Sequence, residues 1–284
     1  MKLSYSREEV ERWRDKTYRR TARSAVTSER QALSFINSVG FCLAAKADGI
    51  ELPSLWEAIM VGHAQGPHPT PGRSYYLSYA WEIQSILPNH NSVYYGKIFR
   101  RRPSLVSREF FPYFYALTER TGERDEHRIE HTHGNLSLLA KQIMDTLFTT
   151  FPMTTKELKA AVEGTGKRGS EGFEKALDEL QRGMFISRVV GSEHQFGAEW
   201  APVIKIFPAE VRRAKKISAE QARYTLLEKY FKNQLVSSVE AIHKVFGWSR
   251  QAIYHAIGQL VHAGVITTTV PPDGNKENLY CLVR

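Results

Sequence analysis

The chain has 284 residues, of which 42% are hydrophobic and 24% charged, a composition typical of a globular protein with room for two or three small domains. Its 39 Lys and Arg outnumber 30 Asp and Glu, and the resulting charge of +9 favours polyanionic partners such as nucleic acid. The two cysteines exclude a disulfide framework and a Cys-rich zinc site. Neither a signal peptide nor an apolar run of about 20 residues is present, so we expect no membrane partner and a cytoplasmic location.

The N-terminal third reads as helical. Ser6 and Glu9 have the spacing of a capping box, which predicts a charged helix from there to about residue 23. A second helix is expected over residues 28–38 and ends before Gly40. Residues 61–74 are rich in proline and glycine and indicate a surface loop. We therefore predict an N-terminal helical domain over residues 1–120, with a degenerate winged helix as the alternative.

Aromatic residues crowd residues 75–115, and three consecutive arginines, Arg100, Arg101 and Arg102, lie among them. Rings beside guanidinium groups can follow a nucleic-acid strand by stacking and by phosphate contact. A buried aromatic core next to a solvated basic turn explains the same residues, and we prefer this interpretation. The three arginines remain candidate nucleic-acid contacts.

Residues 121–133 carry charges of alternating sign and end with three histidines. The spacing of His127, His131 and His133, with Glu130 between them, allows a metal site. No HExxH-type helix accompanies them, so we predict a solvated charged linker and a domain boundary. We predict no metal site and no cofactor anywhere in the chain.

A repeated pattern follows the linker. Residues 134–200 predict a helix, a short helix opened by Thr154 and Glu157, a Gly-rich loop, a third helix capped by Ser170 and a strand. After a connector over residues 201–221, residues 222–284 repeat this order and add the hairpin signal of Asp273 and Gly274. Helix, helix, turn, helix, strand is the winged-helix order. The predicted fold class is therefore mainly α with small β-hairpin wings, in tandem winged helix-turn-helix modules.

Double-stranded DNA is the partner that these modules favour, because the third helix of such a module enters the major groove. In the second copy its exposed start carries Ser249, Arg250, Gln251, Tyr254 and His255. Arg pairs with guanine and Gln with adenine, while Ser and Tyr reach phosphates. In the first copy the matching positions are Lys167 and Arg168, but two acids follow them. Winged helices also bind proteins, which leaves a protein-interaction scaffold as an alternative.

The sequence resembles the AlkZ-related family over most of its length. The resemblance is carried by ELPSLWEA at residues 51–58, YYGKIFRRR at 94–102, LVS at 105–107 and PYFYAL at 112–117. These proteins are relatives of the winged-helix DNA glycosylases, which excise bulky alkylated bases and unhook interstrand crosslinks. The resemblance implies several winged helices around a basic concave surface that holds duplex DNA, and a role in DNA repair.

The catalytic motif of the active relatives is not found here. They carry Gln-x-Gln or Gln-x-Asp just after an N-terminal glycine, where this sequence has Cys42 and Ala44 after Gly40. Neither side chain positions water, so the catalytic residues are unknown, with Glu51 and Glu57 as the candidate acids of an active glycosylase. A transcriptional regulator is a further alternative. The sequence indicates neither an oligomeric state nor a small-molecule ligand.

Overall fold

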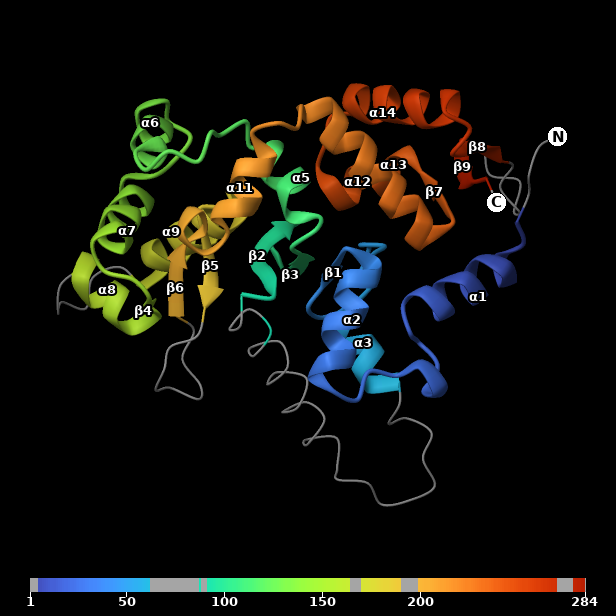
Figure 1. Cartoon of the computed structure of the whole chain (residues 1–284), viewed down its shortest axis with the longest axis horizontal. Coiled ribbons are helices and arrows are strands. Elements are labelled where there is room, and N and C mark those ends of the chain that lie inside the picture. Colours follow the sequence, from blue (N-terminus) through green and yellow to red (C-terminus); the bar gives the residue numbers. More distant parts are fainter. Residues whose placement is uncertain are drawn as a thin grey trace, which may run out of the picture.

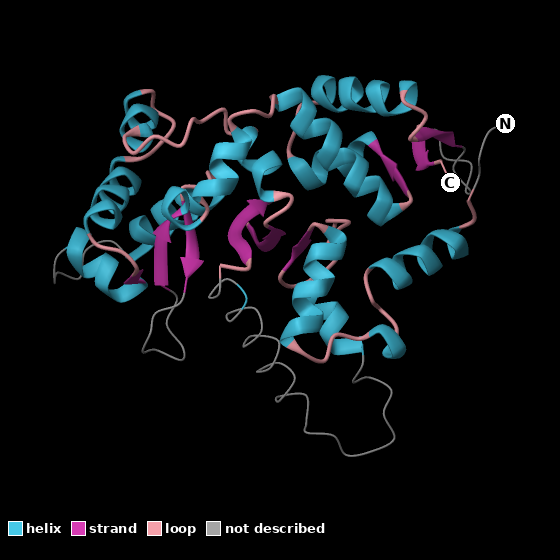
Figure 2. Cartoon of the chain, in the orientation of Figure 1, coloured by secondary structure: helices cyan, strands magenta, loops and turns pink. Residues whose placement is uncertain are grey.

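A computed structural model describes residues 5–61, 87, 91–163, 170–189, 199–269 and 278–283. Helix predominates in it, and the strands gather in small antiparallel sheets (Figure 2). Seen along the chain, the elements form three successive units, coloured blue to green, green to orange, and orange to red in Figure 1. Residues 62–74 of the loop predicted over 61–74 lie outside the described residues, as do the pair Lys167 and Arg168 and the turn at Asp273 and Gly274.

The first unit contains helices and a sheet. Its elements are α1 (Arg7–Thr17), η1 (Ala22–Ser24), α2 (Glu29–Val39), β1 (Phe41–Leu43), α3 (Leu55–Met60), β2 (Val93–Phe99), β3 (Arg102–Ser107) and α5 (Phe111–Ala116). The predicted capping box at Ser6 and the stop at Gly40 are both confirmed. Gly40 has φ 78°, and a Cβ there would lie 2.8 Å from the ring of Phe110, so this position requires glycine. The helical domain expected over residues 1–120 thus also carries three strands.

Helix α1 ends at Thr17, short of the predicted residue 23, and Arg19 just after it has a left-handed φ of 55°; the helix itself is held to the C-terminal part of the chain. The indole Nε1 of Trp13 donates to the Lys232 carbonyl at 3.0 Å, and Arg14 donates to the carbonyls of Gln234 and Val236. The Lys232 and Gln234 carbonyls belong to the last turn of a C-terminal helix, where carbonyls lack intrahelical partners, and Val236 follows that helix in a strand. The chain turns after α1, with the buried ring of Tyr18 at its C-cap.

The second unit comprises α6 (Glu126–Thr132), α7 (Leu138–Thr149), β4 (Met153–Thr154), α8 (Thr155–Glu163), α9 (Ser170–Arg182), β5 (Ile186–Val189), β6 (Glu199–Pro202), α10 (Val203–Ile206) and α11 (Pro208–Ala214). The apolar positions predicted for α9, Phe173, Ala176, Leu177 and Leu180, are all buried. Residues 201–221, predicted as a connector, include two short helices, α10 and α11, whose apolar side chains join the core.

The charged stretch at residues 121–133 is not a solvated linker throughout. It contains α6, and the ring of His127 is only 2% exposed. Nδ1 of His127 lies 3.0 Å from the Arg124 carbonyl, and Nε2 lies 2.9 Å from an Asp145 carboxylate oxygen. Asp145 lies 18 residues further along the chain, so the alternating charges of the segment gave no sign of this burial. The domain boundary at this segment stays a prediction.

The third unit matches its predicted order closely. It comprises α12 (Ala219–Gln234), β7 (Val236–Ser238), α13 (Val239–Phe246), α14 (Arg250–His262), β8 (Ile266–Thr269) and β9 (Leu279–Leu282). Gly247 ends α13 in the left-handed conformation, and the Ser249 hydroxyl accepts from the Ala252 amide at the start of α14.

The three sheets share one topology. Their strand orders are β1-β3-β2, β4-β6-β5 and β7-β9-β8, and every pairing is antiparallel. In each unit a short strand precedes a helix and pairs with the last strand of the later hairpin. The strands β1, β4 and β7 are two or three residues long, too short for a period-two pattern to reveal them in the sequence.

Two hydrophobic clusters meet at the first unit. Phe41 and Leu43 of β1 face the cluster that holds side chains of the third unit and of α10 and α11, whereas Cys42 between them faces the cluster shared with the rest of the second unit. Most described rings of residues 75–115 are buried in these clusters, which confirms the preferred core interpretation of that segment.

Polar side chains also tie the units together. Lys229 and Asn233 of α12 donate to the Ser38 and Val39 carbonyls at the end of α2, at 2.5 and 2.8 Å. Between the first two units, the buried Ser187 hydroxyl bridges the Tyr95 amide and carbonyl, each at 3.1 Å.

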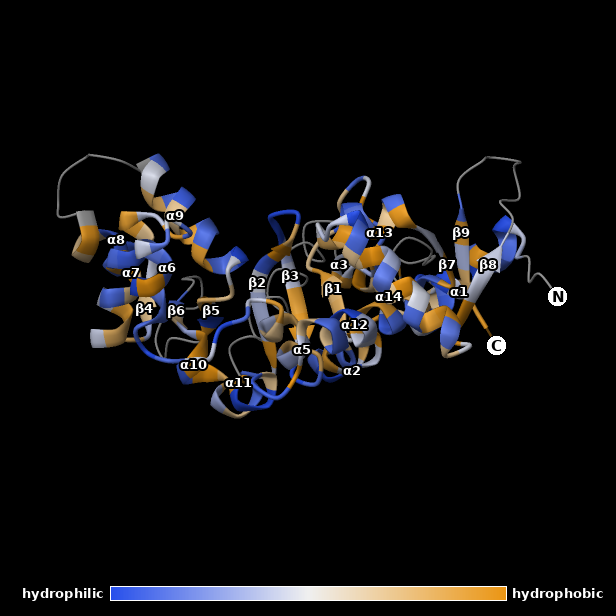
Figure 3. Ribbon diagram, turned by 90° about the horizontal axis from the view of Figure 1, so that it is seen from above, coloured by the Kyte–Doolittle hydropathy of each residue, from blue (hydrophilic) through white to orange (hydrophobic). Residues whose placement is uncertain are grey.

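Seen from above, the three units form a shallow arc (Figure 3). Among the described residues, no helix has the length and apolarity to cross a membrane.

Candidate nucleic-acid interface

The β2–β3 hairpin ends in a two-residue turn made by Arg100 and Arg101. Their φ angles are 49° and 62°, and Phe99 pairs with Arg102 across the turn. A turn with two positive φ angles favours Asn and Gly, so two arginines in it carry a steric cost. All three arginines are exposed, and the turn points to the same side of the arc as α9 and α13, away from α10 and α11 (Figure 3).

Three cations converge beside this turn on the carboxylate of Asp178, in α9. Nε of Arg101 lies 3.0 Å from Oδ2, Nε of Arg182 lies 3.1 Å from Oδ2, and Nζ of Lys97 lies 3.1 Å from Oδ1. The Asp178 side chain is 13% exposed. Burial raises the pKa of Asp178, but the hydrogen bonds from Arg101 and Lys97 outweigh it, so the pKa is lowered and the carboxylate stays charged.

The position of α9 against the hairpin depends on Gly96. The Tyr94 hydroxyl donates to the Gln181 carbonyl near the end of α9 at 3.0 Å, and a Cβ on Gly96 would lie 2.1 Å from that hydroxyl oxygen. The strand also bulges between Gly96 and Phe99, where Lys97 is placed. Gly96 thus lets the Tyr94 ring reach α9 and bring Asp178 to the turn.

The turn group has a large surplus of positive charge. We call Lys97, Arg100, Arg101, Arg102, Asp178 and Arg182 the turn group: Lys97, Arg101 and Arg182 share the Asp178 carboxylate, and Arg100 and Arg102 are exposed beside them, a balance of 5 − 1 = +4. Lys97, Asp178 and Arg182 were not identified from the sequence. The spacing of Asp178 and Arg182 on one helix was visible, but their meeting with Arg101 depends on the packing of α9 against β2.

The predicted recognition helix α14 has a different charge balance. Arg250 Nη2 lies 2.8 Å from a Glu240 carboxylate oxygen, and His255 Nε2 lies 2.9 Å from Glu220. The hydrogen bond from Arg250 lowers the pKa of Glu240, and the one from His255 lowers that of Glu220. Gln251 is exposed, and Tyr254 is 52% exposed. The structure brings these side chains to one helix face, as predicted, but its charges are paired one to one.

An open hollow of about 360 Å³ lies between α12 and the start of α14. Its polar lining comes from Glu220, Arg223, Ser249, Gln251, His255 and Gln259. Glu220 accepts hydrogen bonds from both His255 and Gln259 there. Glu220 and Arg223 were not identified from the sequence, because they lie on α12, and Glu220 is 35 residues away from its partner His255.

The candidate acids Glu51 and Glu57 are each held in an ion pair. Glu51 lies 3.3 Å from Arg14 Nη2, and Glu57 lies 3.0 Å from Lys46 Nζ. The Glu57 amide also donates to the Ser54 hydroxyl at the start of α3, so Glu57 belongs to a helix start. The two acids pair with different basic residues, and no contact joins one acid to the other within the described residues.

Cys42 and Ala44 lie in and just after β1 and are buried. Burial raises the pKa of the Cys42 thiol far above its ordinary value. The Ala44 amide donates to the Pro103 carbonyl at 2.8 Å, and the Trp56 amide donates to the Ala44 carbonyl at 3.1 Å. Neither side chain offers a polar group to a ligand.

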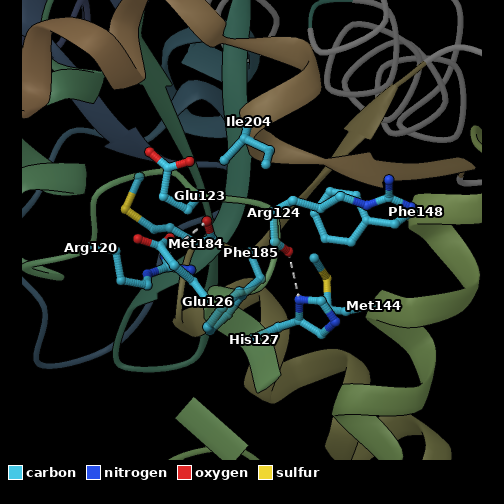
Figure 4. Close-up of a pocket in the computed structure, with 10 residues that line it drawn as sticks. All are labelled: Arg120, Glu123, Arg124, Glu126, His127, Met144, Phe148, Met184, Phe185 and Ile204. Atoms are coloured by element: carbon cyan, nitrogen blue, oxygen red, sulfur yellow. Dashed lines mark hydrogen bonds between the residues drawn. The ribbon is translucent and has the colours of Figure 1, made fainter. Parts of the chain in front are cut away.

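A small pocket lies beside Arg120 (Figure 4). Arg120 donates to the carbonyls of Gly183 and Met184, and its guanidinium lies 3.7 Å from the centre of the Phe185 ring. The pocket volume of about 10 Å³ is room for one water molecule at most. Arg120 therefore binds the chain after α9, His127 binds α6 to Asp145 of α7, and the pocket between them has no space for a substrate.

Comparison with known proteins agrees with the fold. The chain matches a solved structure titled Streptomyces sahachiroi DNA glycosylase AlkZ with a TM-score of 0.63 and 14% identity, covering 99% of this chain and 71% of that one. At this identity the likeness shows the fold alone: a mainly helical chain with small antiparallel sheets. Among curated proteins no sequence matches this chain significantly. The AlkZ-related family matches residues 26–247, more than three quarters of the sequence, and this chain belongs to that family.

Proposed function

We propose that this protein binds double-stranded DNA in the cytoplasm and is a relative of the winged-helix DNA glycosylases with a role in DNA repair. The observation that carries the proposal is the turn group, in which three of five basic side chains share a single carboxylate, on one side of the arc. Such a surplus attracts phosphates and releases the counterions of DNA when it binds. Family membership and the fold of a solved DNA glycosylase support this choice of partner.

Winged-helix modules account for the three units. Each combines helices, a short strand and a hairpin in the strand order expected of a winged helix, so we propose three such modules, the first of them within residues 1–120. The start of α14, with Ser249, Arg250, Gln251 and Tyr254, forms the second DNA contact. Its paired charges suit base reading better than long-range attraction.

A salt series with a charge-matched pair of variants tests the proposal. We expect duplex affinity to fall steeply with salt, with a log–log slope of about −0.9 for each phosphate neutralised. Arg100→Ala with Arg101→Ala should weaken binding at least tenfold and flatten that slope by about 2 units. The control is Arg212→Ala with Arg213→Ala in α11, on the opposite side of the arc, which removes the same charge.

Equal losses in the two double variants contradict a specific role of the turn. Absence of binding to any duplex at low salt contradicts the proposed function as a whole.

We further propose that the protein does not excise simple alkylated purines. The buried Cys42 and Ala44 stand where the active relatives carry a polar pair, and excision requires a group that positions water. The test is incubation with duplex carrying one alkylated purine, followed by alkaline cleavage of abasic sites. We expect no protein-dependent strand breaks. Breaks that disappear in Glu51→Gln or Glu57→Gln identify an active glycosylase with an acid elsewhere.

A further inference from the structure

Asp178 holds its three cations in a way that leaves their remaining donors free. Arg101 and Arg182 both face Oδ2 through Nε, while Lys97 faces Oδ1. Within the described residues, both guanidinium groups make their shortest contact with Asp178 through Nε, and no hydrogen bond runs from Nη1 or Nη2 of either. Two Nη pairs, each able to grip an oxyanion at two points, therefore remain available beside one ammonium group.

These donors are exposed and yet ordered. The Arg101 side chain is 63% exposed and that of Arg182 is 43% exposed, so both can reach a ligand. A free arginine loses rotamer freedom when it binds, and a fixed carboxylate removes much of that cost in advance. Arg101 comes from the turn of the first unit and Arg182 from the last turn of α9 in the second. Their convergence therefore requires both units to be assembled.

We propose that Arg101, Arg182 and Lys97 form a clamp for one phosphate group of the DNA backbone, and that Asp178 is the residue that positions them. The inference rests on the proposed function and names the contact through which that site holds DNA. The two arginines donate through their Nη groups, and Lys97 adds a point charge. Asp178 itself touches no phosphate, because its oxygens stay engaged with the three cations.

The clamp and a plain charge effect predict opposite results for Asp178→Asn. Removing an acid raises the net charge from +9 to +10, so general electrostatics alone predicts tighter DNA binding. If Asp178 positions the clamp, Asp178→Asn instead weakens duplex binding about tenfold, despite the extra positive charge. Asp178→Glu, which keeps the carboxylate, should recover part of that affinity. The matched control is Glu171→Gln on the same helix, since Glu171 is 83% exposed and its ion pair within the described part of the chain is with Lys175.

A second pair of variants covers the case in which Asp178→Asn fails to fold. Arg182→Ala removes an exposed clamp residue and should weaken binding about tenfold, with a salt slope shallower by about 0.9. Lys175→Ala removes the same charge from the same helix, at a side chain that is 70% exposed, and should leave both quantities close to the wild type. Unfolding midpoints of each variant show whether the fold is kept.

The outcomes separate the two proposals. If the wild type binds duplex but Arg182→Ala matches Lys175→Ala, or if folded Asp178→Asn binds as tightly as the wild type, the clamp is wrong and the proposed function stands. If the wild type binds no duplex, the proposed function fails. Inorganic phosphate then tests the clamp alone: it should raise the unfolding temperature above that in chloride of equal ionic strength for the wild type, and not for Arg182→Ala. The absence of that difference overturns the clamp.

Discussion

The turn group and the α14 face use the same kinds of side chain but differ in how their charges are balanced. At the turn, Arg101, Arg182 and Lys97 share one carboxylate, so positive charge remains in excess there. On α14, Arg250 has its own acid in Glu240, and His255 has its own in Glu220. An arginine attracts DNA according to the charge that remains after its neighbours are counted. The sequence pattern indicates α14 as the main DNA contact, whereas the charge balance indicates the turn group.

The largest expected effect is that of Gly96→Ala, which disrupts the turn group and spares α14. The new Cβ meets the Tyr94 hydroxyl, which must move and loses its bond to the Gln181 carbonyl. Overpacking of this kind costs about 1–3 kcal/mol, and the lost buried hydrogen bond adds to it. Urea unfolding should show the loss of stability, and DNA affinity should fall with it. Gly258→Ala is the control, since a Cβ on Gly258 in α14 meets no atom within 4 Å. Unchanged stability in Gly96→Ala contradicts the role assigned to Gly96.

The next effect concerns Arg250→Ala combined with Gln251→Ala. Both side chains are exposed on a capped helix, so the unfolding midpoint should stay close to that of the wild type. A bidentate base contact accounts for about 1–3 kcal/mol of discrimination between sites. Affinity for random duplex should therefore fall less than in the Arg100 and Arg101 double variant, and any preference among sequences should be lost. If this double variant has the larger loss on random duplex, the ranking of the two regions is reversed.

The smallest effect is expected for Glu240→Gln, which removes an acid from the α14 face and leaves it with a surplus of positive charge, as in the turn group. Arg250 then loses its ion pair and has more positive charge to offer DNA. Since both side chains are largely exposed, we expect affinity to rise only about two- to fivefold, with a steeper salt slope. Glu171→Gln again supplies the matched charge change. A rise of the same size in both variants indicates a general charge effect without any role for Arg250.

The sequence by itself determined the local structure of the second and third units. Ser137, Ser218 and Ser249 accept hydrogen bonds at helix starts, Gly247 ends α13, and the apolar spacing of Phe173, Ala176 and Leu180 sets the buried face of α9. These features depend on contacts within a few residues, which is why their pattern is visible in the chain. Family resemblance was equally readable, because it rests on contiguous runs of residues.

Only the tertiary structure decided which acid meets which cation. Asp178 and Arg101 are 77 residues apart, His127 and Asp145 are 18 apart, and Arg14 reaches a carbonyl 220 residues away. The short strands β1, β4 and β7 likewise exist because a hairpin formed later in the chain pairs with them. Charge pairing and strand pairing act through space, and no periodicity along the sequence encodes them. The β2–β3 turn, rather than α14, is the main candidate DNA contact because the turn group is assembled by these long-range contacts.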